Sequence, residues 1–304
     1  MSRPWDRGLV AALIAAGLAV AGCRGGMEAF RFRSAALGRE MRASVYAPRG
    51  WNHRDPLPLV VFLHGLGGDE REPAWGGLTA ELDRWIGEGR IRPFLMVSPD
   101  GEEGFWANWH DGTVRYEDYV VDDVISVVRR RFPVQEGRPG LHLVGVSMGG
   151  VGTLYTALHN LDRFSSAAVV SAPIFDVDET LAFLSDDHWE NLGPMRRIYG
   201  PPEREHVERE NAFARLSSRD DLRGLRLFVA AGTDDSFFAY ETTLAFHRAL
   251  DGRGVPHRYL EFDGGHEWSA WRRVIPVALC HNLPPDGGCR APPDPFYRME
   301  ATGQ

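Results

Sequence analysis

The sequence predicts an α/β protein whose central sheet is mostly parallel, has about eight strands and carries helices on both faces. A length of 304 residues suits one large domain. Strand-like and helix-like segments alternate from residue 29 to residue 281, which is typical of such a sheet. The inner strand-like segments, such as 57–63, are almost wholly apolar, as expected of parallel strands buried on both faces. A net charge of −8 without a long basic tract argues against a nucleic-acid partner.

Residues 1–22 are predicted to be a lipoprotein signal peptide and not part of the fold. The uncharged run at 9–22 is shorter than the roughly 20 apolar residues that a membrane-spanning helix needs. It ends in small residues followed by Cys23, a pattern that resembles bacterial lipoprotein signals, in which this cysteine is lipidated. With residues 23–28 as a short tether, acyl chains would hold the exported protein at a bacterial membrane, on its periplasmic or cell-surface side. An ordinary secretory signal that happens to contain a cysteine is the alternative.

Eight strand-like segments are expected in the catalytic domain, which we place at residues 29–281. The first two have no helix between them, so they should form an antiparallel pair at one edge of the sheet. The segments lie at 29–34, 42–47, 57–63, 93–98, 141–146, 166–171, 225–231 and 257–262.

Helix-like segments separate the later strands. One stretch, 176–216, breaks the alternation because it is polar, rich in turns and without a clean helical period. We interpret it as an insertion above the sheet, where a lid or a substrate wall would lie. Residues 282–304 are rich in Pro and Gly and are predicted to be an irregular tail. The helices are expected at 78–87, 117–131, 148–160, 237–252 and 268–279.

Gly145, Ser147 and Gly149 match the Gly-x-Ser-x-Gly pattern of a nucleophile elbow. In this motif a serine occupies a strained turn between a strand and a helix, and the glycines let the two backbones approach closely. The predicted strand at 141–146 and the predicted helix at 148–160 supply that context. We therefore identify Ser147 as the candidate nucleophile.

A serine nucleophile needs a histidine base, and the base needs a carboxylate to orient it. On a sheet of this kind both follow the serine, each at the carboxyl end of a later strand. His266 is the histidine in that position, because it follows the strand-like segment 257–262 in a tight turn. After the preceding strand both Asp234 and Asp235 qualify as the acid, and we favour Asp235. Alternatively, Asp234 or Ser236 caps the next helix.

The negative charge that develops on an ester carbonyl is stabilised by two backbone N–H donors. We expect one donor from Met148, the residue after the nucleophile, and the other from Leu66 in the glycine-rich loop 64–68. His64, which begins this loop, is predicted to be structural rather than catalytic.

Cys280 and Cys289 remain as a pair once Cys23 is assigned to lipid. Disulfides persist in exported proteins, and the short segment between the two cysteines is easily closed. We therefore expect a disulfide between them. The alternative is a buried free thiol at Cys280 on the last helix.

Taken together, these motifs resemble the α/β-hydrolase superfamily, and within it the esterase D-like "putative esterase" family. That family includes S-formylglutathione hydrolases, tributyrin esterases, feruloyl esterases and the mycolyltransferases of antigen 85. The resemblance covers about residues 30–280. It implies an α/β-hydrolase fold that needs no metal and no organic cofactor. It also implies that Asp235 is the acid of the catalytic triad. The motifs are HGLGG at 64–68, SPDG at 98–101, YED at 116–118, GVSMGG at 145–150, SAPIFD at 171–176, GTDDSFF at 232–238 and DGGHEW at 263–268.

The chain also departs from some of these relatives. The S-formylglutathione hydrolases typically have Thr-Cys where this chain has Gly67-Gly68, and they act in the cytosol. An exported protein without that cysteine is therefore not expected to have their activity.

Five residues are candidates for contact with the substrate. The loop that holds Trp106, Asn108 and Trp109 follows a strand at its carboxyl end, so it should border the cleft. Two tryptophans and an asparagine suit an apolar or aromatic acyl group, or the face of a sugar. Trp189 and Trp268 are weaker candidates of the same kind. The alternative for each tryptophan is that it packs beneath its loop.

The expected activity is that of a serine carboxylesterase acting through an acyl-enzyme. Short-chain or aryl esters, either small molecules or acyl groups linked to a polysaccharide, are the expected substrates. One alternative is an acyltransferase, which would pass the same acyl group to an alcohol. A non-catalytic surface lipoprotein that binds a ligand is the other.

Overall fold

The structure is a computed structural model that positions most of the chain. The signal peptide, Cys23 and Trp189 lie outside the described residues, so their assignments stay predictions. No helix within the described part of the chain is both long and apolar enough to cross a membrane. The described residues are 26–186, 195–217, 219–289, 291 and 294–302.

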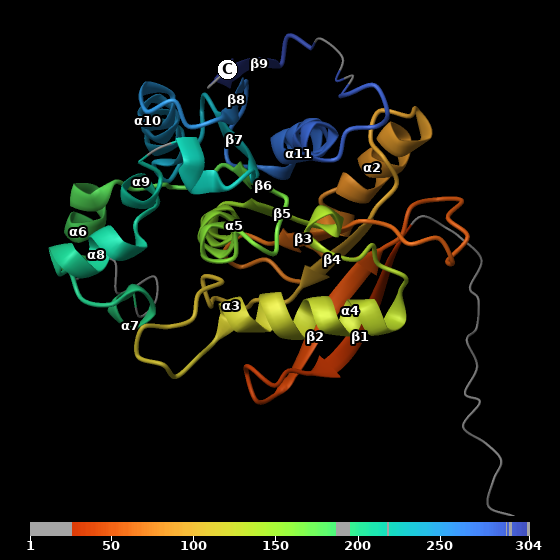
Figure 1. The fold of residues 1–304 in the computed structure, drawn as a ribbon, viewed down its shortest axis with the longest axis horizontal. Helices are drawn as coiled ribbons and strands as arrows, with labels where there is room; N and C mark the ends of the chain where they lie inside the picture. Colours follow the sequence, from red (N-terminus) through yellow and green to blue (C-terminus); the bar gives the residue numbers. More distant parts are fainter. Residues whose placement is uncertain (1–25, 187–194, 218, 290, 292–293, 303–304) are drawn as a thin grey trace, which may run out of the picture.

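Nine strands in the described part of the chain form one sheet, in the order β1-β2-β4-β3-β5-β6-β7-β8-β9 (Figure 1). The six from β4 to β8 in this order run parallel. β1 and β2 form the expected antiparallel pair at one edge. The eight predicted strands are β1 (Met27–Arg33), β2 (Glu40–Tyr46), β3 (Leu59–Leu63), β4 (Leu95–Pro99), β5 (Leu141–Val146), β6 (Ser166–Val170), β7 (Arg226–Gly232) and β8 (His257–Phe262).

The prediction of an irregular C-terminal tail is wrong for its last part. Tyr297–Thr302 forms β9, which pairs antiparallel with β8. Without β9, strand β8 would present an open row of N–H and C=O groups at the edge of the sheet. The expected disulfide between Cys280 and Cys289 is present, and it ties the beginning of the tail to the last helix.

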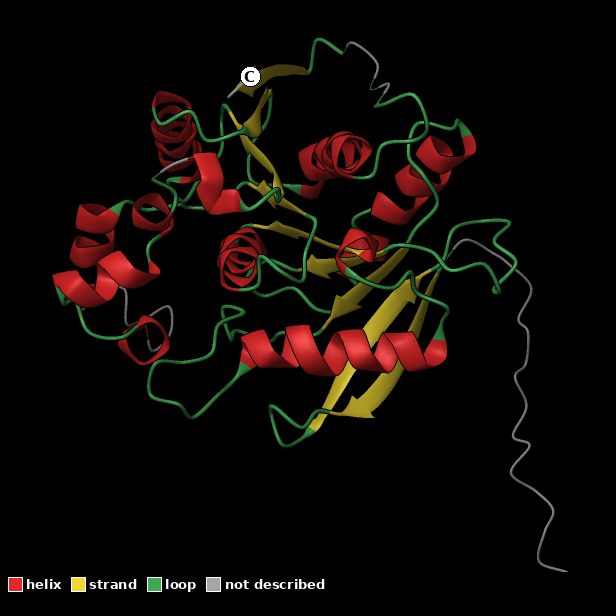
Figure 2. Cartoon of the chain, viewed as in Figure 1, coloured by secondary structure: helices red, strands yellow, loops and turns green. Residues whose placement is uncertain are grey.

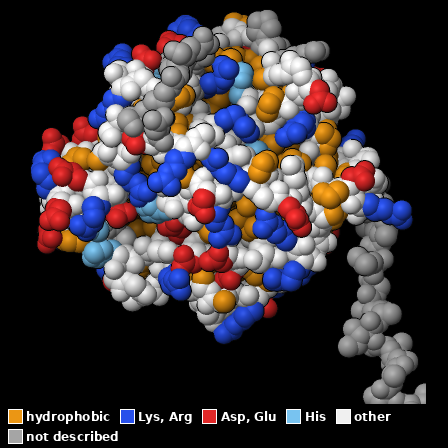
Figure 3. Space-filling model, viewed as in Figure 1, with side chains coloured by type: hydrophobic (Ala, Val, Ile, Leu, Met, Phe, Trp, Pro, Cys, Tyr) orange, Lys and Arg blue, Asp and Glu red, His pale blue; other side chains and the backbone are white. Residues whose placement is uncertain are grey.

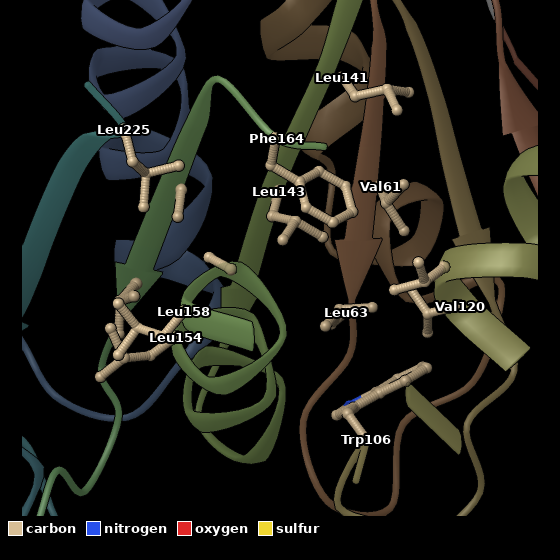
Figure 4. Packing of buried hydrophobic residues seen from close by; sticks show 14 of the residues in the cluster. Val61, Leu63, Trp106, Val120, Leu141, Leu143, Leu154, Leu158, Phe164 and Leu225 are labelled. Carbon is tan, nitrogen blue, oxygen red and sulfur yellow. The ribbon is translucent and has the colours of Figure 1, made fainter. Parts of the chain in front are cut away.

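Helices cover both faces of the sheet (Figure 2). Apolar side chains of α2 and α11 pack on one face, and those of α4, α5 and α10 pack on the other. Figure 4 shows the second of these layers, in which Leu154 and Leu158 of α5 meet the strands. The helices are α1 (Glu72–Trp75), α2 (Leu78–Gly87), α3 (Tyr116–Asp118) continuing through a π-helical turn (Tyr119–Val124) into α4 (Ile125–Arg131), α5 (Met148–His159), α10 (Ala239–Gly252) and α11 (Trp268–Asn282).

The described part of the predicted insertion at 176–216 forms short helices that project beyond the carboxyl ends of the strands (Figure 1). Asp176 and Glu179 form a capping box, in which each side chain accepts the other's backbone N–H. This pair fixes the start of the insertion. Its described helices are α6 (Val177–Ser185), α7 (Met195–Tyr199), α8 (Arg204–Glu210) and α9 (Ala212–Arg215).

Acidic and basic side chains are interspersed on the face of the molecule shown in Figure 3. Arg163 and Asp122, for example, form an exposed ion pair at 2.9 Å. Exposed pairs of this kind contribute about 1 kcal/mol or less to stability. The core described above, and not this surface, therefore supplies most of the stabilisation.

Candidate active site

Ser147 occupies the turn between β5 and α5 with φ of 55° and ψ of −123°. Non-glycine residues adopt such a conformation at a cost in energy, and they do so mainly at functional sites. A side chain on Gly145 would collide with the backbone of Gly149, and one on Gly149 would collide with that of Leu63. The two glycines are therefore what allows the turn to present the serine hydroxyl above the sheet.

His266 joins Ser147 to Asp235. Its Nε2 atom lies 2.8 Å from Oγ of Ser147, and its Nδ1 atom lies 2.7 Å from Oδ1 of Asp235. A carboxylate can only accept, so Nδ1–H donates to Asp235 and Nε2 is left to accept the serine O–H. The Asp235 side chain is completely buried and that of His266 is 14% exposed. This arrangement can remove the serine proton as the hydroxyl attacks.

The structure brings Asp235, and not Asp234, to the histidine. Asp234 is exposed, and its backbone N–H donates to the carbonyl of Gly264. The suggestion that Asp234 or Ser236 caps the next helix is wrong, because the residue that precedes α10 is Phe238, in a left-handed conformation.

The two expected oxyanion donors lie beside the serine. A Cβ atom placed on Gly65 would be 3.4 Å from Cβ of Ser147, so the loop 64–68 passes directly alongside the nucleophile. Leu66 and Met148 both line the pocket that contains Ser147. Within the described residues, the N–H of neither has a hydrogen-bond acceptor. Both groups are thus available to an oxygen atom of a substrate.

His64 has a structural role, as predicted. It is completely buried, and its Nε2 accepts the N–H of Gly101 at 2.9 Å. Its Nδ1–H therefore donates to the carbonyl of Gly65 at 2.8 Å. Burial lowers the pKa of His64, which keeps this ring neutral.

A pocket of about 180 Å³ opens beside Ser147, and its lining is mainly apolar and aromatic. The inserted helices contribute one wall of it, as predicted for the segment 176–216. Phe237 stands at the mouth, edge-on to His266 with 5.2 Å between ring centroids. The lining residues are Leu66, Phe105, Ser147, Met148, Val151, Leu154, Tyr155, Pro173, Ile174, Phe175, Thr180, Phe183, Leu184, Met195, Tyr199, Ala212, Phe237 and Phe238.

Trp106 lies in the core and does not line the pocket beside Ser147, contrary to prediction. It is 1% exposed, and Figure 4 shows it among core side chains next to Leu63. Its indole N–H donates to the carbonyl of His64 at 3.1 Å. The ring packs against Gly152, where a side chain would collide with it. Trp106 therefore lies beneath the site and supports it.

Three further substrate candidates also lie away from the pocket. The Asn108 amide donates to Asp118 at 2.9 Å. The Trp109 indole donates to the carbonyl of Gly104 at 3.2 Å, and a guanidinium stacks over its ring. The Trp268 indole donates to Glu72 at 3.1 Å. None of the three lines the pocket beside Ser147. The two tryptophans pack within the protein, which is the alternative that the sequence left open. Asn108 lines a neighbouring cavity that shares Tyr155 and Tyr199 with the Ser147 pocket, so its contact with substrate stays a prediction.

Sequence reasoning missed the aromatic residues that do line the pocket. One signal was available on α5, where Val151 and Tyr155 follow Ser147 at intervals of four residues and so share its side of the helix. Another was the pair Phe237-Phe238 directly after the candidate acid. Within the described residues no group of His, Cys, Asp or Glu is arranged to hold a metal ion.

Similar proteins include esterases and an acyltransferase. The "Putative esterase" family matches residues 34–281. An acetyl esterase of Caldicellulosiruptor saccharolyticus is 24% identical over 228 residues, which are 73% of this chain and 82% of that protein. A diacylglycerol acyltransferase/mycolyltransferase Ag85B of Mycobacterium avium is 23% identical over 275 residues, 81% of this chain and 79% of its own.

Solved structures share the fold. A ferulic acid esterase superposes with a TM-score of 0.70 at 21% identity, covering 86% of this chain and 99% of its own. An S-formylglutathione hydrolase of Staphylococcus aureus superposes with a TM-score of 0.65 at 23% identity, covering 86% of this chain and 100% of its own. The chain therefore has the α/β-hydrolase fold.

Proposed function

The chain belongs to the "Putative esterase" family and is a hydrolase of carboxylic esters, and we propose that it acts through an acyl-enzyme on Ser147. The observation that carries this proposal is the hydrogen-bonded series from Asp235 through His266 to Ser147. In this geometry the nucleophile is hydrogen-bonded to its general base, and the base is hydrogen-bonded to a carboxylate that orients it.

In the proposed reaction, Ser147 Oγ attacks the ester carbonyl while its proton moves to Nε2 of His266. Asp235 stabilises the resulting imidazolium, and the N–H groups of Leu66 and Met148 stabilise the tetrahedral oxyanion. Collapse breaks the bond to the alcohol, which leaves with the proton from His266. Water then attacks the acyl-enzyme, giving its proton to His266, and collapse of the second intermediate returns that proton to Ser147 and releases the acid.

The pocket supports a preference for short-chain or aryl acyl groups. Its apolar lining favours hydrocarbon over a charged acyl group, because a charge there would lose its hydration. The inner wall contains Tyr155 and Tyr199, whose ring centroids are 6.4 Å apart. No hydrogen-bond partner for either hydroxyl exists in the described part of the protein. The two hydroxyls suit an acyl group with a polar atom at its far end.

Acyl transfer is the second candidate function. The similarity to a protein named as an acyltransferase favours it, since both reactions share the acyl-enzyme. The two differ only in whether water or an alcohol attacks that intermediate. A product that forms only when an alcohol is added would identify a transferase.

We also propose that the protein is exported and anchored through lipid on Cys23, with its active site facing away from the membrane. β1 runs parallel to β3 and β5, because it is antiparallel to β2 and β2 is antiparallel to β4. Its first residue, Met27, therefore lies at the amino ends of the parallel strands, opposite the edge that bears Ser147. Figure 1 shows the start of β1 and helices α6–α8 at opposite sides of the sheet. This orientation favours a soluble or polysaccharide-linked ester as the substrate.

The proposed hydrolysis is tested with p-nitrophenyl esters from acetate to palmitate, together with a ferulate ester. The protein truncated after Cys23 is compared with its Ser147→Ala variant. We expect serine-dependent turnover that is greatest for the shorter or aryl esters. Absence of turnover by both proteins would reject the simple hydrolase and leave transfer or ligand binding.

A further inference from the structure

Glu72 is a buried carboxylate beside the active site that the proposed reaction does not use as an acid or base. It is the first residue of α1 and is 4% exposed. Its Oε2 accepts the backbone N–H of Gly65 at 3.1 Å, and its Oε1 accepts the indole N–H of Trp268 at 3.1 Å. A Cβ atom placed on Gly68 would be 2.7 Å from Oε2, so the loop 64–68 folds directly over this carboxylate.

Hydrogen bonds in this region fix the orientation of two consecutive peptide groups, the one between His64 and Gly65 and the one between Gly65 and Leu66. In the first plane, the carbonyl of His64 accepts from Trp106, and the N–H of Gly65 donates to Glu72. In the second plane, the carbonyl of Gly65 accepts from Nδ1 of His64 and from the N–H of Gly68. Because C=O and N–H point in opposite directions across a trans peptide, fixing the Gly65 carbonyl also aims the Leu66 N–H.

We propose that Glu72 is a positioning residue for ester hydrolysis, and that its ionised carboxylate holds the loop 64–68 so that the Leu66 N–H faces the oxyanion. The inference rests on the proposed function, since it concerns the same site. Glu72 acts through the loop and touches no reacting atom. The ionised form is the one required, because a carboxylate accepts both hydrogen bonds, whereas protonation turns one of its oxygens into a hydroxyl.

The charge state of Glu72 changes near neutral pH. The pKa of Glu72 is raised to about 7, mainly by burial and to a smaller extent by the negative charge of Asp69 in the neighbouring loop. The hydrogen bonds from Trp268 and Gly65 and the proximity of His266 act in the opposite direction and are already included in this value. Protonation of Glu72 below this pH weakens its hold on the loop.

This role leaves a recognisable pH dependence. The ratio of kcat/KM of the wild-type protein to that of Glu72→Gln should be greatest above about pH 7 and should fall toward one at lower pH, because the Glu72 carboxyl of the wild-type protein is then neutral as well. The two proteins share the same triad, so this ratio isolates the charge of Glu72. A glutamine has one carbonyl oxygen for two donors, so kcat on the plateau should fall about ten- to a hundredfold, part of the cost of losing an oxyanion donor. KM should change by less than about twofold, since the oxyanion exists only in the transition state.

The matched control is Glu70→Gln. Glu70 lies two positions away and is 5% exposed, but its nearest charged partner is Arg42 at 3.6 Å. It contacts neither Gly65 nor Trp268 through a hydrogen bond in the described structure. The ratio of wild-type kcat/KM to that of this variant should stay constant with pH.

A second variant covers the case in which Glu72→Gln does not fold. Trp268→Phe keeps a ring at this position but removes the donor to Oε1, which should raise the pKa of Glu72 and move the acid limb to higher pH. A ratio of kcat/KM between the wild-type protein and Glu72→Gln that does not change with pH, with kcat unchanged, would overturn this inference and leave the proposed function in place. An unmoved acid limb in Trp268→Phe would do the same. Turnover that survives Ser147→Ala would overturn the proposed function, and this inference with it.

Discussion

The Nε2 atom of His266 lies 2.8 Å from the Oγ atom of Ser147, although 119 positions separate the two residues in the sequence. The parallel sheet makes this possible, because β5 and β8 end at the same edge and each delivers one of the two residues there. Asp235 arrives from β7 between them. The fold thus assembles, from three separate loops, a group that can remove the serine proton.

Asp235→Asn should abolish most of the activity, whereas Asp234→Asn should not. An amide at position 235 cannot stabilise the imidazolium and favours the wrong tautomer of His266, so kcat should fall about a thousand- to ten-thousandfold. Asp234 is exposed, and its variant should remain within a few fold of wild type. Steady-state turnover of p-nitrophenyl acetate measures both. A larger loss in the Asp234 variant would show that the acid is misassigned.

Val151→Trp should shorten the acyl group that the enzyme accepts. Val151 lies one helical turn after Ser147 and lines the pocket, so an indole there fills space that a longer chain needs. Because each methylene in an apolar pocket is worth about 1–3 kcal/mol, the ratio of kcat/KM for hexanoate to that for acetate should fall at least tenfold. Turnover of acetate by the same variant is the internal control. An unchanged ratio would place the acyl chain outside this pocket.

Glu72 should make the protein less stable as the pH rises from about 4.5 to about 7. The folded pKa is about 7 and the ordinary value is 4.5, so in this interval the folded chain keeps a proton that the unfolded chain has lost. Linkage then lowers the free energy of unfolding by roughly 3 kcal/mol over the interval. Glu72→Gln lacks this titration. The free energy of unfolding of Glu72→Gln, measured in urea and compared with that of the wild-type protein, should therefore increase by that amount between pH 4.5 and pH 8. A difference between the two proteins that stays constant with pH would contradict the raised pKa of Glu72.

Replacing both cysteines of the Cys280–Cys289 pair with serine should loosen the C-terminal tail. The disulfide closes a short loop, which predicts a loss of about 2–3 kcal/mol of unfolding free energy through the entropy of the unfolded chain. Strand β9 follows this loop, so in the variant its amides should lose protection and exchange with solvent faster than those of β7. Hydrogen exchange, measured on the variant and on the wild-type protein, follows both strands in one sample. Equal protection of β9 in the two proteins would show that the strand is held by its pairing with β8 alone.

Cys23→Ser should release the protein from the membrane fraction. The chain carries a net charge of −8, which gives no overall electrostatic attraction to anionic lipid, so in this proposal covalent acyl chains supply the attachment. Fractionation of cells that express each form, followed by an esterase assay, checks this. Continued membrane association of the Cys23 variant would contradict the lipoprotein assignment.

The residues that the sequence predicted to lie together at the site, and that the structure does bring together, are those with local signals. Ser147 lies in a glycine-flanked turn after an apolar strand, and His266 follows the last parallel strand, so their positions could be inferred from neighbouring residues. Most of the parallel strands were predictable for a similar reason, since the inner ones, such as β3 and β5, are apolar runs bounded by turn residues.

The features that the sequence did not predict depend on contacts between distant segments. Whether Trp106 faces substrate or core is decided by Gly152 of α5, which leaves room for the indole beneath the loop. Strand β9 is a short alternating segment at the end of a Pro- and Gly-rich stretch, and it is ordered by pairing with the edge of β8, a contact between segments that the sequence does not show. Glu72 becomes a candidate only when its burial beneath the loop 64–68 is known.

The most direct test of the central claim is to look for the acyl-enzyme itself. The truncated protein is mixed with a slowly hydrolysed p-nitrophenyl ester and quenched within one turnover, and its peptides are analysed by mass spectrometry. The proposed mechanism predicts that the mass of the acyl group appears on the peptide that contains Ser147, decays as the acid is released, and is absent from Ser147→Ala. An acyl group on another residue, or full turnover by Ser147→Ala, would contradict it.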